Sequence, residues 1–291
     1  MADEMTITRQ GTLAQADDVQ IPLTVGMLAR RLAAKFPEGD AEPWDVYGMT
    51  VGDPDAEITR VAVALDATVS NVQRAASVGA NVLVTHHPAF LDFPERLQPA
   101  PTMPAPGGIL WEAVTQGVAI MSFRTALDAQ PAANALLPNM LNLLAGEVFK
   151  PIEAGSGKGF GRICAPKEDD ALTLGALASR CTAIFGIQPR VWGDFSAKLS
   201  RIVTWGGGLG SAVEAADLPG LDCIVCGEVK YHTALDLAEA GVGVIELGHD
   251  VSEMPLTLLL ATAVQDCGVD QAAIHLLDRG AHWTLPETIR V

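Results

Sequence analysis

The chain has 291 residues, of which 49% are hydrophobic and 5% aromatic, and its 35 acidic and 19 basic side chains give a formal net charge of −16. This length permits one large or two modest domains, and the many small aliphatic residues favour a layered α/β protein over an all-β sandwich. Because nucleic-acid binding requires cations that neutralise phosphates, the acidic balance argues against a nucleic-acid partner, although a metal ion could still attract a small anionic substrate.

Cysteine usage and the apolar segments indicate where the protein works. The five cysteines are scattered and odd in number, unlike the framework of a disulfide-stapled secreted protein. Residues 1–20 are polar and acidic, so we expect a flexible tail there and not a signal peptide. No apolar run reaches the length that a membrane-spanning helix needs. We therefore expect a soluble, cytoplasmic protein without a membrane partner.

Hydrophobic periodicity predicts a regular succession of strands and helices. The first half begins with a helix at 23–36 and continues with a strand–helix–strand unit at 60–67, 68–79 and 80–88. A proline-rich loop at 89–106, a helix at 107–117 and a strand with its exit loop at 117–128 follow. The second half contains a strand, helix, strand, helix, strand and long final helix, at 201–208, 209–220, 221–229, 231–241, 241–250 and 251–268. Such alternation is typical of a sheet with parallel strands covered by helices.

The two halves of the sequence align without a gap. Residues 60–87 match residues 201–228, so that Arg60 falls on Arg201 and Val84 on Val225. Any two strand–helix–strand units share Val, Ala and Gly by composition, which explains part of the match. The equal strand spacing and the matching arginine favour an internal duplication, and hence two similar lobes.

Two adjacent histidines, His86 and His87, follow the apolar run at 81–84. Ligands of α/β sheets bind beyond the carboxyl ends of strands. Successive side chains in an extended chain point to opposite faces, so each imidazole could serve a different ion. The alternative is a pair of surface histidines in a loop, but the position at a strand end favours metal ligands.

Three more residues at strand ends extend this candidate site. His249 follows the predicted strand of the second half, and Glu253 lies four residues later, on the same side of a helical turn. Imidazole and carboxylate can share one metal ion, and a carboxylate can bridge two. Asp128 stands at another strand end. The alternative role for Asp128 and Glu253 is helix capping, which is compatible with metal ligation.

Glu228 and His232 form a second acid–imidazole pair four residues apart, after the strand that contains Cys226. We treat both as candidates for supporting the metal ligands or for proton transfer, the alternative being that they are surface residues of a helix.

Two further motifs carry weaker signals. Cys223 and Cys226 lie inside an apolar strand with no second such pair, so core packing is the better interpretation than a zinc or redox site. The loop Gly206–Gly210 offers backbone amides to a phosphate, but it lacks the lysine of a P-loop and the full spacing of a dinucleotide-binding motif.

Several blocks of the sequence together resemble one known family. They are WDVYGMTVG (44–52), VALDAT (63–68), VTHHP (84–88), TALD (125–128), GEVKYHTALDLAEAG (227–241) and GHDVSE (248–253). Their combination and order resemble the dinuclear metal-centre family of GTP cyclohydrolase type 1, type 2 homologues, which is also named for a yeast transcription-factor-interacting protein. The resemblance spans roughly residues 23–290, nearly the whole chain.

The resemblance implies an α/β fold with two pseudo-repeated three-layer lobes and a metal cleft between them. Two divalent ions would be held by His86, His87, Asp128, His249 and Glu253, in a ring-shaped homohexamer. We expect residues 21–130 to form the first lobe, 131–200 the connecting part of the second, and 201–291 its completion. Some relatives carry an extra domain between the lobes, and the stretch from Asp128 to Glu228 is too short for one here.

One residue departs from the family pattern. The family usually reads His-Thr-Asn-Leu-Asp before its aspartate, whereas this chain has arginine at the first position, Arg124, and alanine at the third, Ala126. An arginine cannot act as a general base near neutral pH, but it can clamp a phosphate or carboxylate. We therefore expect Arg124 to contact substrate and the choice of substrate to differ.

The resemblance and the ligand set together predict a metal-dependent hydrolase that uses a metal-bound water on a small, nucleotide-like molecule. The alternative is a non-enzymatic metal-binding protein, a metal chaperone or an interaction scaffold. Imidazole and carboxylate ligands without thiolate leave zinc, iron, manganese and cobalt open.

Overall fold

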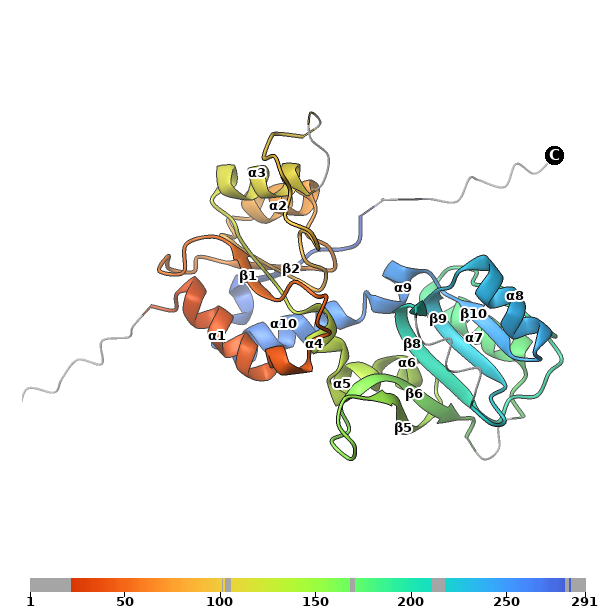
Figure 1. The fold of residues 1–291 in the computed structure, drawn as a ribbon. Coiled ribbons are helices and arrows are strands. Elements are labelled where there is room, and N and C mark those ends of the chain that lie inside the picture. Colours follow the sequence, from red (N-terminus) through yellow and green to blue (C-terminus); the bar gives the residue numbers. More distant parts are fainter. Residues whose placement is uncertain are drawn as a thin grey trace, which may run out of the picture.

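The structure is a computed structural model that describes residues 22–100, 102, 106–167, 171–210, 218–280 and 283. The predicted tail at 1–20 and residues 211–217 of the predicted helix at 209–220 lie outside the described residues. Two α/β lobes lie side by side and are joined by short helices (Figure 1). Among the described residues, no helix is both long enough and apolar enough to cross a membrane.

The first lobe is a sheet with helices on both faces. Its strand order is β1-β4-β3-β2-β11; β1 runs antiparallel to β4, and the other neighbours pair in parallel. Alternate side chains face opposite ways, so Val61 and Val63 pack with α1 and α10 while Ala62 and Ala64 pack with α2 and α3. The elements are α1 (Val25–Lys35), β1 (Gly48–Val51), β2 (Val61–Ala64), α2 (Val69–Ser77), β3 (Val82–Thr85), α3 (Gly107–Gln116), β4 (Ala119–Ser122), α10 (Leu256–Asp266) and β11 (Ile274–Leu276).

The second lobe has a larger, mixed sheet of order β5-β6-β8-β9-β10-β7, whose centre β8-β9-β10 is parallel. Leu177 of α7 packs on one face with Val225, and Leu237 of α8 packs on the other with Ile224. The expected α/β class is therefore confirmed for both lobes. The elements are β5 (Leu144–Pro151), β6 (Gly159–Ala165), α7 (Leu174–Phe185), β7 (Arg190–Trp192), β8 (Ile202–Gly208), β9 (Cys223–Glu228), α8 (Tyr231–Glu239) and β10 (Gly243–Glu246).

The strand pairing of the two lobes follows the predicted duplication. In the first lobe β2 pairs with β3 in parallel, with Val61 opposite Val82, and in the second β8 pairs with β9 in parallel, with Ile202 opposite Cys223. Both pairs have the same offset along the chain, and Val61 and Ile202 are equivalent in the gapless alignment of the two halves. The repeat in the sequence is thus a repeat in strand register.

The last part of the chain returns to the first lobe, which corrects the assignment of all of 201–291 to the second. Leu260 of α10 packs in the core of the first lobe, and β11 extends the first sheet beside β2. In Figure 1 the blue α10 lies beside the red α1. The apolar face of α10 is buried by β2 and β3, and this burial decides the lobe to which the helix belongs.

The predicted final helix at 251–268 is two helices. The first, α9, covers His249–Glu253, and α10 begins after Pro255. Proline has no backbone N–H to continue a helix, which explains the break. Shorter helices connect the remaining elements: η1 (Glu38–Asp40), α4 (Arg124–Asp128), α5 (Pro131–Asn134), α6 (Leu136–Met140) and η3 (Gln271–Ala273).

Candidate metal centre

The five residues expected to bind metal lie together between the lobes, although they come from three separate segments. His86 and His87 directly follow β3 of the first lobe. Asp128 is the last residue of α4, which follows β4, and His249 and Glu253 begin and end α9, which follows β10. The carboxyl ends of β3 and β4 lie at one edge of the first sheet, and the carboxyl end of β10 in the second sheet leads into α9, which carries His249 and Glu253 to the same place between the lobes.

Glu253 is the centre of this cluster, since its two carboxylate oxygens face different imidazoles. Its Oε1 lies 3.7 Å from Nε2 of His86, which is also 3.5 Å from Oδ1 of Asp128. Its Oε2 lies 3.0 Å from Nε2 of His87 and 3.1 Å from Nε2 of His249. The side chain of His86 is fully buried, and that of Glu253 is 5% exposed.

Several buried atoms of the cluster make close ion-pair contacts at most, but no hydrogen bond of good geometry, in the described structure: both ring nitrogens of His86, Nε2 of His87 and Oε2 of Glu253. Buried polar atoms nearly always make hydrogen bonds, so a group of such atoms without hydrogen bonds indicates that they bind a common ligand. One ligand atom from each of His86, His87 and Glu253 lies within 4.8 Å of the others. The residues therefore fit a metal ion, and imidazole with carboxylate suits zinc, iron, manganese or cobalt.

Two acidic residues orient the imidazoles. Oδ1 of Asp66 lies 2.8 Å from Nδ1 of His87, and Oε1 of Glu228 lies 2.9 Å from Nδ1 of His249. A carboxylate at Nδ1 directs Nε2 of the ring toward the metal and raises its basicity. Glu228 was a candidate for this role from the sequence. Asp66 was missed, although it follows β2 at the same sheet edge as His86, and that position was the available signal.

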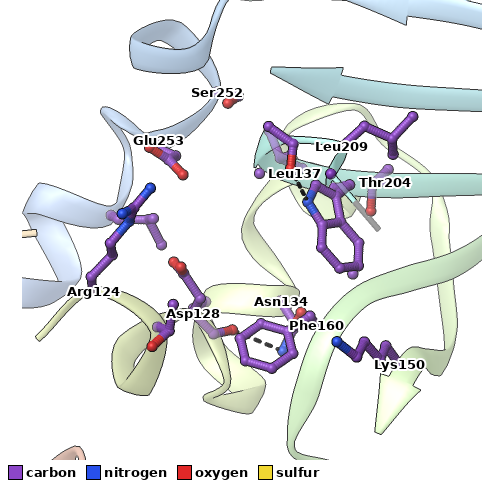
Figure 2. Close-up of a pocket in the computed structure, with 18 of the residues that line it drawn as sticks. Arg124, Asp128, Asn134, Leu137, Lys150, Phe160, Thr204, Leu209, Ser252 and Glu253 are labelled. Carbon is purple, nitrogen blue, oxygen red and sulfur yellow. Dashed lines mark hydrogen bonds between the residues drawn. The ribbon is translucent and has the colours of Figure 1, made fainter. Parts of the chain in front are cut away.

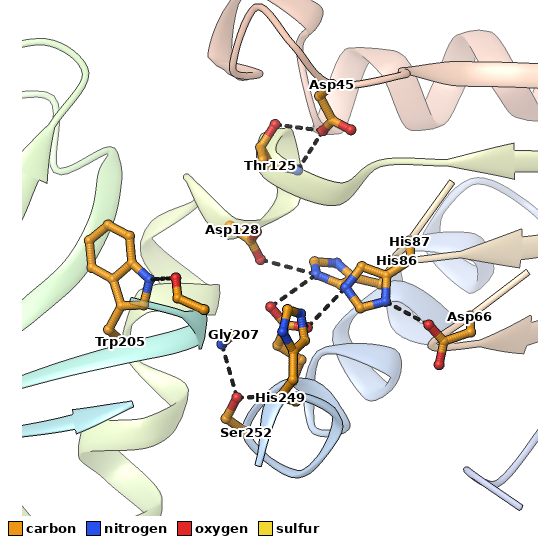
Figure 3. Close-up of polar contacts among 12 residues, drawn as sticks. Asp45, Asp66, His86, His87, Thr125, Asp128, Trp205, Gly207, His249 and Ser252 are labelled. Atoms are coloured by element: carbon orange, nitrogen blue, oxygen red, sulfur yellow. Dashed lines mark hydrogen bonds and ion pairs between the residues drawn. The ribbon is translucent and has the colours of Figure 1, made fainter. Parts of the chain in front are cut away.

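Hydrogen bonds from a distant loop hold α4, the helix that carries Asp128. Oδ2 of Asp45 accepts from the backbone N of Thr125 at 2.9 Å and from its hydroxyl at 2.6 Å (Figure 3). At the other end, Nδ2 of Asn134 donates to the backbone carbonyl of Asp128 at 3.1 Å. No role was predicted for Asp45 or Asn134: Asp45 acts on a residue 80 positions away, and no local pattern distinguished Asn134.

The glycine loop Gly206–Gly210 makes room for Glu253. A Cβ on Gly207 would lie 2.2 Å from Oε1 of Glu253, and the residue has φ +65°, where glycine is favoured. The backbone N of Gly207 donates to the hydroxyl of Ser252 at 2.9 Å, and the backbone N of Leu209 donates to the carbonyl of Glu228 at 2.8 Å. Two backbone amides of the loop Gly206–Gly210 thus donate hydrogen bonds within the chain and are not available to a phosphate, which weakens the interpretation of this loop as a phosphate site.

The titratable side chains of the cluster shift one another's pKa values. Burial lowers the pKa of His87, but the carboxylates of Asp66 and Glu253 outweigh burial and raise it to about 9. The carboxylate of Glu253 likewise raises the pKa of His249 to about 9 against burial. Burial raises the pKa of Asp128 to about 6. Burial also acts to raise the pKa of Glu253, yet the three imidazoles hold it well below its ordinary value.

The other candidates from the sequence lie outside the cluster. His232 is exposed on α8 and packs edge-on against the ring of Tyr231, with 5.2 Å between centroids, and it has no hydrogen bond or ion pair to the described residues of the cluster. Arg124 lines a cavity beside the cluster. Cys223 and Cys226 are free and buried in β9, as core packing predicted.

Two α/β lobes with a cluster of imidazoles and carboxylates between them define a class of candidate metal-binding proteins. Within it, this chain belongs to the Duf34/NIF3 (NGG1p interacting factor 3) family, whose sequence model matches residues 23–277. The family expected from the sequence blocks is thereby confirmed.

Relatives of known sequence and structure agree with this assignment. The chain is 26% identical over 227 residues to a GTP cyclohydrolase 1 type 2 homolog of Clostridium acetobutylicum, covering 77% of this chain and 83% of that one. It is 29% identical over 233 residues to a homolog of the same name from Streptomyces coelicolor, covering 77% and 79%. The crystal structure of a Staphylococcus aureus hypothetical protein has the same fold, with a TM-score of 0.79 at 23% identity over 91% of this chain and 100% of that one.

Proposed function

We propose that this chain is a metal-dependent hydrolase that holds two divalent ions and acts on a small, nucleotide-like molecule. The ligands are His86, His87, Asp128, His249 and Glu253. The names of the relatives from Clostridium acetobutylicum and Streptomyces coelicolor support hydrolysis of such a substrate.

The arrangement of the two oxygens of Glu253 carries the proposal of two ions. One oxygen faces His86, which is also close to Asp128, and the other faces both His87 and His249. A single ion would need all these donors around one point. Two sets of donors that share the carboxylate of Glu253 would suit two neighbouring ions, the number used by binuclear hydrolases.

Divalent ions at such a site supply acidification of water and stabilisation of negative charge on a substrate. The chain's own residues prepare the site for that chemistry. Asp66 and Glu228 fix the ring orientation of His87 and His249 through Nδ1. Beside the cluster, a cavity of about 310 Å³ lined by Asp128, Glu253 and residues of both lobes admits a small molecule.

Elemental analysis tests the ligand set. Protein purified without added metal should carry about two divalent ions per chain, His87→Ala should lose at least one, and the matched control His232→Ala should keep both, since His232 is outside the cluster. A chain that binds no ion after careful purification would contradict the proposal.

Turnover separates the hydrolase from a non-enzymatic metal-binding protein or metal chaperone. The metal-loaded protein should hydrolyse a nucleotide, a phosphoester or a cyclic amide well above the rate of His87→Ala. If two ions are bound but none of these compounds is hydrolysed faster than by that variant, the non-enzymatic function replaces the hydrolase.

The resemblance to the family also leads us to propose a homohexamer, and the composition of the chain leads us to propose that it works in the cytoplasm without a nucleic-acid or membrane partner. The five cysteines are free and buried, which agrees with a reducing compartment. Native mass spectrometry should give a hexamer of the 30.5-kDa chain. A monomer or dimer at micromolar concentration would contradict this assembly.

A further inference from the structure

A cavity of about 310 Å³ adjoins the metal cluster and is lined by both lobes (Figure 2). Trp44 and Arg124 line it from the first lobe, and Lys150, Phe160 and Trp205 line it from the second. Ligand pockets usually range from about 300 to about 1,000 Å³. The cavity is therefore near the lower limit and suits a compact ligand.

Arg124 presents to this cavity a guanidinium whose N–H donors are unused within the described part of the chain, although its charge also acts on the nearby carboxylate of Asp128. Its guanidinium lies over the ring of Trp44, 4.9 Å from the centroid, a cation–π contact that fixes the side chain. Among the described residues it has no hydrogen-bond or ion-pair partner. In Figure 2 it reaches toward Glu253 and Asp128, whose carboxylates face the imidazoles. The planar fork of N–H donors is thus available to a carboxylate or phosphate.

The second cation of the cavity, Lys150, does not play the same role. Its Nζ lies 3.2 Å from Oε1 of Glu42, and that carboxylate balances its charge. Its ammonium also lies over the ring of Phe160, 5.8 Å from the centroid. An anion entering the cavity therefore has its stronger partner in Arg124, on the side of the metal cluster.

The opposite part of the cavity is aromatic and fixed in place. The rings of Phe160 and Trp205 have centroids 6.3 Å apart and planes tilted by 40°. The indole N–H of Trp205 donates to the carbonyl of Gly208 at 3.0 Å (Figure 3), so its ring has a set orientation. Gly161 lets it approach, since a Cβ there would lie 2.7 Å from Cε3 of Trp205. Such a surface favours a flat ring over a flexible chain.

We propose that this cavity selects small molecules in which a flat aromatic ring is joined to a phosphate or carboxylate. The anionic group binds Arg124 beside the metal cluster, and the ring packs against Phe160 and Trp205. In this orientation the bond beside the anionic group lies next to the metal cluster, and the far side of the ring points away from it. The inference rests on the proposed function only for calling the bound molecule a substrate, because binding is measurable without turnover.

Calorimetric titration of the full-length, metal-loaded protein tests the inference with four probes: phenyl phosphate, benzoate, benzyl alcohol and inorganic phosphate. Phenyl phosphate or benzoate should bind at least about tenfold more tightly than benzyl alcohol, since a charge-assisted hydrogen bond to arginine is lost with the neutral probe. Whichever of phenyl phosphate and benzoate binds with the lower dissociation constant shows whether the site prefers a phosphate or a carboxylate. Inorganic phosphate should bind more weakly than phenyl phosphate because it has no ring.

Two variants separate the two parts of the site. Arg124→Gln should weaken phenyl phosphate at least about tenfold, and the matched control Arg96→Gln, an exposed arginine outside the cavity lining, should not change it. Phe160→Leu should weaken phenyl phosphate about threefold or more while inorganic phosphate is unaffected. Melting temperatures and metal contents of all variants establish that they are folded and loaded.

The results also distinguish this inference from the proposed hydrolase. Equal binding by Arg124→Gln and Arg96→Gln would overturn the anion site, and equal affinity for phenyl phosphate and inorganic phosphate would overturn the ring site. If phenyl phosphate binds through Arg124 but no compound is hydrolysed, the cavity assignment stands and the hydrolase fails. If hydrolysis occurs with a KM that Arg124→Gln does not change, the hydrolase stands and the assignment fails.

Discussion

His87 and His249 share one carboxylate oxygen of Glu253, and each has a second carboxylate at Nδ1. In the metal-free protein this arrangement favours the protonated imidazoles, and the pKa of each rises to about 9. Metal ions bind neutral imidazole, so protons and metal compete for the same nitrogens.

The metal-free protein should lose stability as the pH rises from about 6.5 to about 9. A histidine whose folded pKa lies above its unfolded value contributes fully below the unfolded pKa of about 6.5 and loses its contribution as the pH passes the folded value. Asp128, with a pKa of about 6, has mostly titrated below this window. The melting temperature of chelated protein should fall by roughly 5 °C or more between pH 6.5 and 9.5.

Metal affinity should change in the opposite direction over the same pH range. Binding near pH 7 should release protons, which calorimetry in buffers of different ionisation enthalpy detects, and affinity should level off above about pH 9. A melting temperature that is constant from pH 6.5 to 9.5, or binding without proton release, would contradict the raised pKa values. His87→Ala is the control and should show a smaller loss of stability.

At the scale of elements, the end of β8 decides whether α9 can present Glu253 to the imidazoles. Gly207 approaches the carboxylate so closely that a side chain has no space, and Ser252 of α9 accepts the hydrogen bond of its backbone N. The strand end and the helix are therefore one structural unit. Its glycines were visible in the sequence, but their function depends on a helix more than forty residues away.

Gly207→Ala should reduce metal affinity by at least about tenfold, because the added Cβ displaces Glu253. Gly210→Ala is the matched control: its φ is also positive, at +43°, but nothing lies within 4 Å of the added Cβ. Both variants carry backbone strain, and only the first should lose metal. Competition with a chromogenic chelator measures the difference; equal affinities would show that Gly207 does not set the position of Glu253.

At the scale of the whole molecule, the described part of the chain crosses between the lobes twice, and each crossing carries a carboxylate of the cluster. The first runs from α4 through α6 and carries Asp128, and the second runs from α9 to α10 and carries Glu253. The site therefore forms only when both lobes are folded and joined. The packing of α10 in the core of the first lobe holds the second connection, from α9 to α10, in place.

Leu260→Ala should reduce the free energy of unfolding by about 2–5 kcal/mol, since the side chain is fully buried in the first lobe. Leu258→Ala, in the same helix but 59% exposed, should change it by less than about 0.5 kcal/mol. Urea denaturation of the metal-free proteins measures both values. Similar losses in the two variants would contradict the packing of α10 on the first lobe.

Most elements of this fold were predictable, because hydrophobic periodicity and turn residues act over a few neighbouring positions. The strand–helix–strand units, the repeat and the positions of His86, His87 and His249 after strands all follow from such local patterns. The break at Pro255 was missed, because the periodic pattern on either side suggested a single helix, although the proline itself was the available signal.

Only the tertiary structure decided the remaining features, namely which lobe each element joins and which side chains meet at the site, because these features depend on residues far apart in the chain. The return of α10 and β11 to the first lobe follows from which apolar faces bury each other, and no local pattern encodes that choice. The same holds for Asp66 beside His87 and for the cavity where Arg124 of one lobe meets Phe160 of the other. The sequence by itself determined the family and predicted which side chains gather between the lobes, whereas packing between the lobes determined the contacts of those side chains and the cavity beside them.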